Sequence, residues 1–189
     1  DALSAKGVKR MNGSVEEIRK GIPSEPVSAF VFKTVVDPFV GKITLFKVMS
    51  GTMKKDTDVY NADIGESERI GGVFYLRGKD QIETSEVLAG DIGATSKLQY
   101  FKTGDTISIK TNPIVYEGID FPKPCYFVAV SGKTKDSDEK IGTGLHRLNE
   151  EDPTFSIERN TETKELVIGG QGNIQLDVIA SKLKNNFKV

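Results

Sequence analysis

Short β-prone segments that alternate with turn residues dominate residues 26–118, and this alternation constrains the fold more than any other feature. Residues 27–36 follow two prolines and can place alternate side chains on the two faces of a strand. Asp37-Pro38 and Gly41 then predict a turn, because proline fixes φ and pushes the preceding residue toward extended backbone. A long strand is expected over residues 41–50, where the next Gly ends it.

Further strands are expected at regular intervals along the same half of the chain. One begins near Val59, and others span residues 69–76, 91–98 and 105–109. A spacing of about ten residues, with Gly, Asp and Thr in the turns, is typical of an antiparallel barrel. We therefore predict an antiparallel β-barrel domain for residues 26–118.

The second half of the chain shows helical periodicity after the stiff connector Phe121-Pro-Lys-Pro124. The expected elements are a strand at 126–130, a helix capped by Asp136 or Ser137 and ending at Asp152, strands at 154–159 and 165–169, and a helix at 173–187. This order lacks only the last strand of a ferredoxin-like fold. We predict an α+β ferredoxin-like domain over residues 119–189, truncated before its last strand, with an unpaired edge at residues 126–130.

Residues 1–25 are polar and contain glycine, so we interpret them as a linker or tail. The chain begins at Asp1 without a methionine, which we take to indicate a piece of a longer protein. There is no apolar run of about 18 residues and no signal-peptide pattern, so we expect no membrane partner and a cytoplasmic location. The single cysteine, Cys125, fits a reducing compartment and is expected to be buried.

Charge and composition argue against several classes of function. The net charge of −1 weighs against a free-standing nucleic-acid binder. One histidine, His146, and one cysteine provide no metal-ligand set or catalytic constellation, and the sequence has no phosphate-binding loop. We expect no catalytic, cofactor-binding or metal-binding residues. A stand-alone single-stranded RNA-binding module remains an alternative, for which Tyr75 near Arg77 and Lys79 is the relevant cluster.

Five motifs indicate a family. They are Asp-Pro-Phe-Val-Gly-Lys (37–42), Ala-Gly-Asp-Ile-Gly-Ala (89–94), Gly-Lys-Thr-Lys (132–135), Leu-Asn-Glu-Glu-Asp-Pro-Thr-Phe (148–155) and Gly-Gly-Gln-Gly-Asn-Ile-Gln-Leu-Asp (169–177). Together they resemble the second and third domains of elongation factor G, a ribosomal translocase, and of related translational GTPases. The resemblance covers about residues 25 to 189. It implies that the barrel is of the translation-factor type.

The resemblance also implies a function. In such factors the barrel docks on small-subunit ribosomal RNA and protein, and the third domain links the GTP state of a nucleotide domain to tRNA–mRNA translocation. GTP and magnesium would bind to the nucleotide domain of the parent chain, not to these residues. By position, Asp152, Thr154 and Gln175 would face that nucleotide domain, and Lys133 and Lys135 are candidates for contact with the ribosome.

The chain departs from the family pattern at one helix start. Gln171, Asn173 and Gln175 stand where the family commonly has Met, Glu and His. This departure leaves open a divergent paralogue that acts in ribosome protection or recycling.

Overall fold

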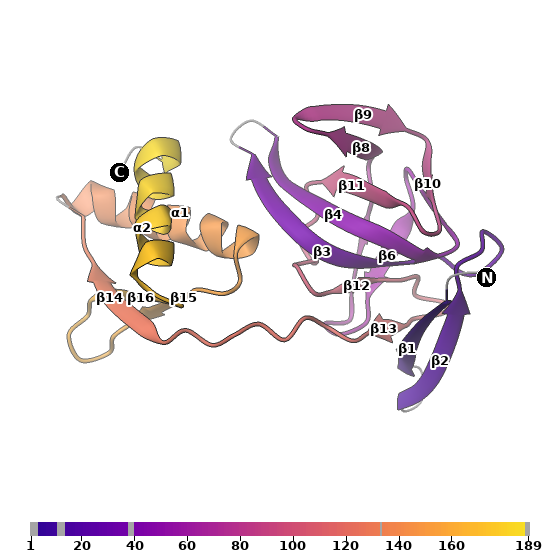
Figure 1. The fold of residues 1–189 in the computed structure, drawn as a ribbon, viewed down its shortest axis with the longest axis horizontal. Coiled ribbons are helices and arrows are strands. Elements are labelled where there is room, and N and C mark those ends of the chain that lie inside the picture. Colours follow the sequence, from indigo (N-terminus) through magenta and orange to yellow (C-terminus); the bar gives the residue numbers. More distant parts are fainter. Residues whose placement is uncertain (1–3, 11–13, 38–39, 133, 188–189) are drawn as a thin grey trace. The chain divides into compact units, whose positions relative to one another are not determined.

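The structure is a computed structural model, which describes residues 4–10, 14–37, 40–132 and 134–187. The chain divides into two compact units, residues 1–119 and 120–189 (Figure 1). No helix in the described residues has the length and apolar character needed to cross a membrane.

The first unit is built around the long antiparallel hairpin of β3 (Ser28–Asp37) and β4 (Gly41–Ser50). This hairpin belongs to a six-stranded sheet in the order β12-β3-β4-β11-β8-β9. The other strands are β8 (Val73–Arg77), β9 (Asp80–Thr84), β11 (Ile92–Ser96) and β12 (Thr106–Ile107). Their inward side chains form a core of fully buried residues that includes Val31, Phe46 and Ile107.

Four short strands complete the barrel. They pair as β5 (Thr52–Lys54) with β10 (Glu86–Leu88) and β6 (Asp58–Asn61) with β7 (Glu66–Arg69). Tyr60 and Ser108 exchange backbone hydrogen bonds of 2.8 and 3.1 Å, which connect β6 to the chain beyond β12. The predicted antiparallel barrel is confirmed. The strand expected at 69–76 is instead divided between β7 and β8, because the two pair with different partners.

The prediction that residues 1–25 form a linker is wrong. They contain β1 (Ser4–Arg10) and β2 (Ser14–Lys20), and β1 also pairs with β13 (Val115–Tyr116). Arg19 is only 1% exposed, and it pairs with Glu17. Its terminal nitrogens donate to the carbonyl oxygens of Pro26 at 3.3 Å and Asn112 at 3.1 Å. These bonds fasten the polar hairpin to the barrel, and their partners could not be identified from local sequence.

The second unit is a three-stranded antiparallel sheet with both helices on one face (Figure 1). Its elements are β14 (Tyr126–Val130), α1 (Lys135–Glu151), β15 (Ser156–Arg159), β16 (Leu166–Gly170), α2 (Asn173–Lys182) and a π-helical turn, η1 (Leu183–Phe187). The sheet order β14-β16-β15 is that of a ferredoxin-like domain without its last strand, as predicted. Strand β14 pairs with β16 along one edge, and within the described residues its other edge has no strand partner, as predicted for residues 126–130.

Helix α1 differs from the prediction at its N-terminus. Its N-cap is Thr134, rather than Asp136 or Ser137, and the Thr134 hydroxyl accepts from the Ser137 amide at 3.3 Å. Two glycines within the helix have different environments. A Cβ at Gly144 would lie 2.7 Å from Leu183 Cδ2, whereas one at Gly142 would meet nothing within 4 Å. Only Gly144 is therefore required by packing.

We predict opposite effects when each of these glycines is replaced by alanine. Gly142→Ala should raise the free energy of unfolding of the second unit by about 1 kcal/mol, because alanine favours the helix. Gly144→Ala should lower it by about 1 kcal/mol, since overpacking against η1 exceeds the gain in propensity. Urea unfolding followed by NMR signals of the second unit measures both changes. Equal stabilisation by the two variants would contradict the packing observed at Gly144.

Candidate interdomain contact site

One hydrogen-bonded cluster contains Asp152, Thr154 and Gln175, of which Gln175 lies 23 and 21 residues after the other two. Asp152 is the C-cap of α1, and Thr154 lies in the short loop that leads to β15. Gln175 lies in the first turn of α2. The cluster therefore joins the end of one helix to the start of the other.

The hydrogen bonds within the cluster fix the orientation of each side chain. Thr154 donates its hydroxyl to Asp152 Oδ1 at 2.5 Å, and its amide donates to the same oxygen at 3.0 Å. Gln175 Nε2 donates to Asp152 Oδ2 at 2.9 Å and to Thr154 Oγ1 at 2.7 Å. Both carboxylate oxygens and both amide hydrogens of Gln175 are used.

The other end of the Gln175 amide anchors the loop before α2. Gln175 Oε1 accepts from the Gln171 amide at 2.7 Å. A Cβ at Gly170 would lie 2.8 Å from the same oxygen, so a larger residue there would displace the Gln175 side chain. The amide of Gln171, a candidate anion donor at the helix start, is therefore already bonded within the chain.

The electrostatics of the cluster favour an ionised carboxylate. Partial burial opposes ionisation of Asp152, but hydrogen bonds from Thr154 and Gln175 outweigh it. Together with the nearby Lys182 ammonium, they lower the pKa of Asp152 below its ordinary value. The ammonium of Lys182 itself pairs with Glu151 at 2.7 Å.

This arrangement suits recognition rather than catalysis. All three side chains are partly exposed, so a partner can reach an ionised carboxylate held in a fixed geometry. The Thr154 hydroxyl is bonded to Asp152, but the lowered pKa of this carboxylate makes it a poor base for activating a nucleophile. In the part of the chain that the structure describes, no group of His, Cys, Asp and Glu side chains could hold a metal ion.

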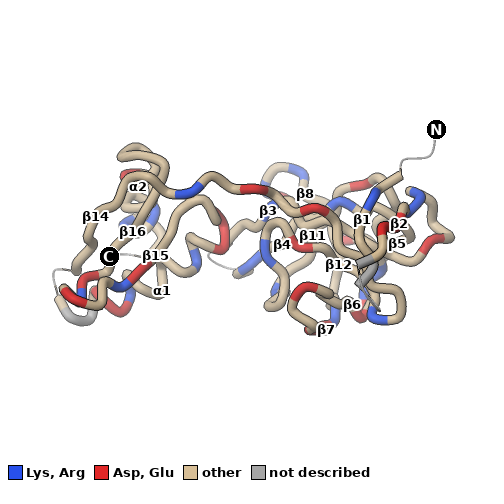
Figure 2. The backbone as a smooth tube through the Cα atoms, turned by 90° about the horizontal axis from the view of Figure 1, so that it is seen from below, with Lys and Arg blue, Asp and Glu red and all other residues tan. Residues whose placement is uncertain are grey.

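The two lysines predicted to contact the ribosome lie outside this geometry. Lys133 is not among the described residues, and for Lys135 only the backbone, which begins α1, is described. Lysine and arginine alternate with aspartate and glutamate along each unit (Figure 2). The aromatic ring considered for RNA stacking, Tyr75, packs against the barrel core, and its hydroxyl donates to Asp91 at 3.4 Å.

Gln171 is a structural contact that the sequence did not reveal. Its Nε2 donates to the carbonyl oxygens of Pro122 at 3.2 Å and Thr154 at 3.4 Å. The connector is thereby held against the loop that carries the cluster. Cys125, predicted to be buried, is exposed, and its thiol contacts the Gln171 carbonyl at 3.3 Å. For the contacts of Gln171, the only signal in the sequence was that glutamine stands where the family commonly has methionine.

Comparisons with known proteins agree with the division into two units. A family model described as elongation factor G domain 2 matches residues 26–110, and one described as Elongation Factor G, domain III, matches residues 121–189. A crystal structure of a protein from Thermus thermophilus is 28% identical, with a TM-score of 0.76 over 87% of this chain. The chain spans 25% of the length of that protein.

The contribution of Asp152 to the free energy of unfolding of the second unit should depend on pH. Because the folded-state pKa is lowered, the contribution of the carboxylate is full above the unfolded-state pKa of about 3.9 and is lost as pH falls through the folded value. Asp152→Asn should therefore cost about 1–2 kcal/mol at pH 7 and progressively less in acid. Urea unfolding of the second unit between pH 2 and 8 measures this difference.

The control is Asp177→Asn, which changes an exposed carboxylate on the same helix as Gln175. It should have little effect on the free energy of unfolding at either end of the pH range. A loss for Asp152→Asn that stays constant over the whole range would contradict the ionised cluster.

Proposed function

We propose a coupling function for this chain, whose two units are domains 2 and III of the elongation factor G family of translation factors. In this proposal they link the GTP state of a nucleotide domain to tRNA–mRNA translocation. The observation that carries this proposal is the cluster of Asp152, Thr154 and Gln175. It presents a fixed, ionised acceptor at the junction of two helices.

The position of the cluster supports a coupling role. A partner that contacts Asp152 acts on the C-terminus of α1, and through Gln175 it acts on the N-terminus of α2. Gln175 also fixes the loop that holds the connector through Gln171. A change at this one surface would therefore reach both helices and the entry of the chain into the domain. The nucleotide domain of the parent chain, with its GTP and magnesium, is the partner we propose for this face.

The barrel, in this proposal, docks on small-subunit ribosomal RNA and protein in the cytoplasm. Surface lysines would position phosphates without reading base identity. The net charge of −1 provides little long-range attraction to RNA, so most of the affinity would come from the rest of the parent protein. A stand-alone RNA-binding module is less well supported, because Tyr75 is held by the barrel and Asp91.

A divergent paralogue that acts in ribosome protection or recycling is the second candidate. Gln171 favours it, because its side-chain amide makes two hydrogen bonds that a methionine at this position could not make. These bonds give the connector an attachment that the common family pattern lacks.

Replacing Thr154 by valine in a full-length factor that contains this chain tests the coupling role. The variant keeps the size of the side chain, but this side chain can neither donate to Asp152 nor accept from Gln175, while the backbone amide at position 154 still donates to Asp152. We expect tRNA–mRNA movement to slow by about tenfold, which corresponds to about 1.4 kcal/mol in the barrier, while ribosome-stimulated GTP hydrolysis continues. Rapid-kinetic measurement of both steps distinguishes these effects.

The matched control is Thr143→Val, because Thr143 is exposed on α1 and its hydroxyl bonds only within that helix. It should leave both rates unchanged. An unaltered translocation rate for Thr154→Val, in a protein that folds normally, would refute the coupling role.

A charge-reversal pair tests the proposed ribosome contact. Lys133→Glu combined with Lys135→Glu should weaken binding of the chain to small ribosomal subunits by about tenfold at low salt, because contacts with phosphates are lost. The same loss should make the binding less dependent on salt concentration. Co-sedimentation over a range of salt concentrations measures both quantities. Lys184→Glu, an exposed lysine in η1, is the control, and an equal loss for it would contradict a specific contact.

A further inference from the structure

A groove of about 630 Å³ lies between α1 and the hairpin of β15 and β16. Its apolar residues include Val130, Ile157 and Leu166, which also pack against the core of the unit. The opposite wall includes Asp138, Gly142 and His146, which are four residues apart and share one face of α1. The groove is separate from the residues of the interdomain cluster.

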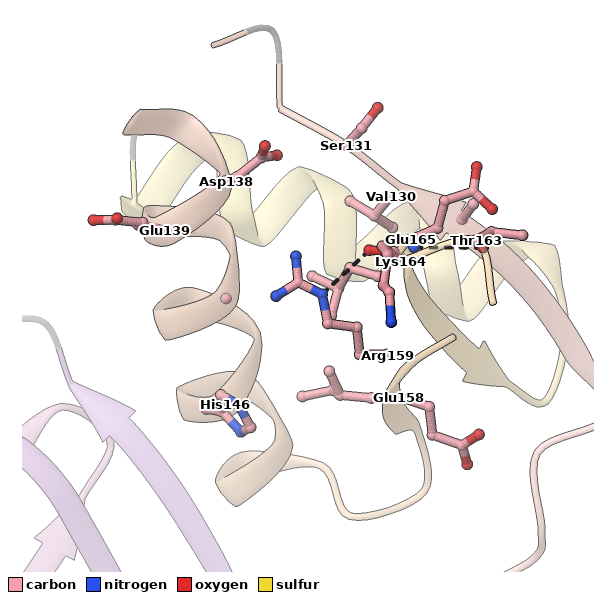
Figure 3. A pocket seen from close by; sticks show the side chains of 14 residues that line it. Val130, Ser131, Asp138, Glu139, His146, Glu158, Arg159, Thr163, Lys164 and Glu165 are labelled. Carbon is pink, nitrogen blue, oxygen red and sulfur yellow. Dashed lines mark hydrogen bonds between the residues drawn. The ribbon is translucent and has the colours of Figure 1, made fainter. Parts of the chain in front are cut away.

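The absence of a side chain at Gly142 keeps the groove open. A Cβ built at this position meets no atom within 4 Å. Asp138 and His146, about one turn before and after Gly142 on α1, line the same wall of the groove (Figure 3). A glycine in a helix interior costs about 1 kcal/mol relative to alanine. At Gly144 that cost is explained by close packing, but at Gly142 packing gives no such reason.

Arg159 and Lys164 supply the lysine and arginine charges among the residues that line the groove. The Nε of Arg159 donates to the Lys164 carbonyl at 3.2 Å, which orients the guanidinium group toward α1 (Figure 3). Among the described residues, no hydrogen bond or ion pair joins its two terminal nitrogens to another side chain or backbone oxygen. They are therefore available to a ligand as a planar pair of donors.

The acidic residues around the groove do not neutralise this arginine. Glu139, Glu158 and Glu165 direct their carboxylates away from the guanidinium (Figure 3). Asp138 lies nearer to the groove, but its Oδ1 accepts from the Gly132 amide at 2.6 Å. The rim is consequently acidic, while the exposed guanidinium of Arg159 lies beside the apolar surface of the groove.

We propose that this groove binds a small monocarboxylate with an apolar body. The carboxylate pairs with the two terminal nitrogens of Arg159, and the apolar body lies against Ile157 and Leu166. The volume is within the range of about 300–1,000 Å³ that is usual for small-molecule sites. The acidic rim disfavours ligands with several negative charges, such as a phosphate backbone, because it repels them. This site is independent of the proposed coupling function.

An NMR titration of the ¹⁵N-labelled chain tests the proposal with three matched probes. 4-Phenylbutyrate carries the carboxylate, 4-phenylbutyramide is its neutral counterpart, and 4-phenylbutylamine carries the opposite charge. The carboxylate should produce saturable shifts of the amide signals of Gly142, Arg159 and Leu166. The neutral amide should bind at least tenfold more weakly, and the amine should not shift these signals. Benzyl phosphate serves as the dianionic probe and should bind more weakly than the carboxylate.

Two variants separate the contributions of charge and space. Arg159→Gln should weaken 4-phenylbutyrate binding by at least tenfold, whereas Arg147→Gln, which changes another exposed arginine outside the groove, should leave it unchanged. Gly142→Leu should block binding by filling the groove. Any of four results would overturn the proposal. They are equal binding of the acid and the amide, tighter binding of the amine or of benzyl phosphate than of the acid, amide shifts at residues outside the groove, and unchanged 4-phenylbutyrate binding by Arg159→Gln.

Discussion

The hydrogen bonds around the Asp152 carboxylate are the interaction on which the organisation of the second unit depends. Apolar packing brings α1 and α2 onto one face of the sheet, but it does not fix how the end of one helix meets the start of the other. Directional bonds from Thr154 and Gln175 do so. Because the carboxylate is only partly buried, the same group that orders the helix ends also remains available to a partner.

The first unit uses the same physical device in a different place. Its barrel core is apolar, whereas the N-terminal hairpin is polar and is held by the buried guanidinium of Arg19. A second polar contact lies close by, where the hydroxyls of Ser28 and Tyr116 approach to 2.6 Å. A buried charge is tolerated only when its hydrogen bonds are satisfied. These contacts therefore specify where the hairpin attaches, while the apolar core supplies most of the stability.

Membership of the elongation factor G family gives these contacts a functional context. The bonds among Gln171, Gln175 and Asp152 join residues 121–124, both helix ends and the loop before β15, as the proposed coupling role requires. The groove beside Arg159 lies on the same helix, α1, but uses a different part of it. A ligand there would contact the helix whose C-terminal end belongs to the cluster.

Local sequence signals determined the class and order of the elements. The bounds of β4 and β14 were predicted to the residue, because turn residues adjacent in sequence delimit both strands. The missing strand of the ferredoxin-like order followed from the same signals. The family motifs grouped Asp152, Thr154 and Gln175 as one face, which stays a prediction, and they gave no sign of the hydrogen bonds that join the three side chains.

The distant partners of polar side chains became visible only in the folded chain. The strands β1 and β2 were not predicted, because the burial of Arg19 depends on Asn112, which is 93 residues away. The same reason applies to Gln171, whose amide reaches the connector 49 residues earlier in the chain. Local elements could be read from the chain alone, since turn and periodicity signals act between neighbours. The attachments between them depend on the path of the chain in space, and no local pattern encodes that path.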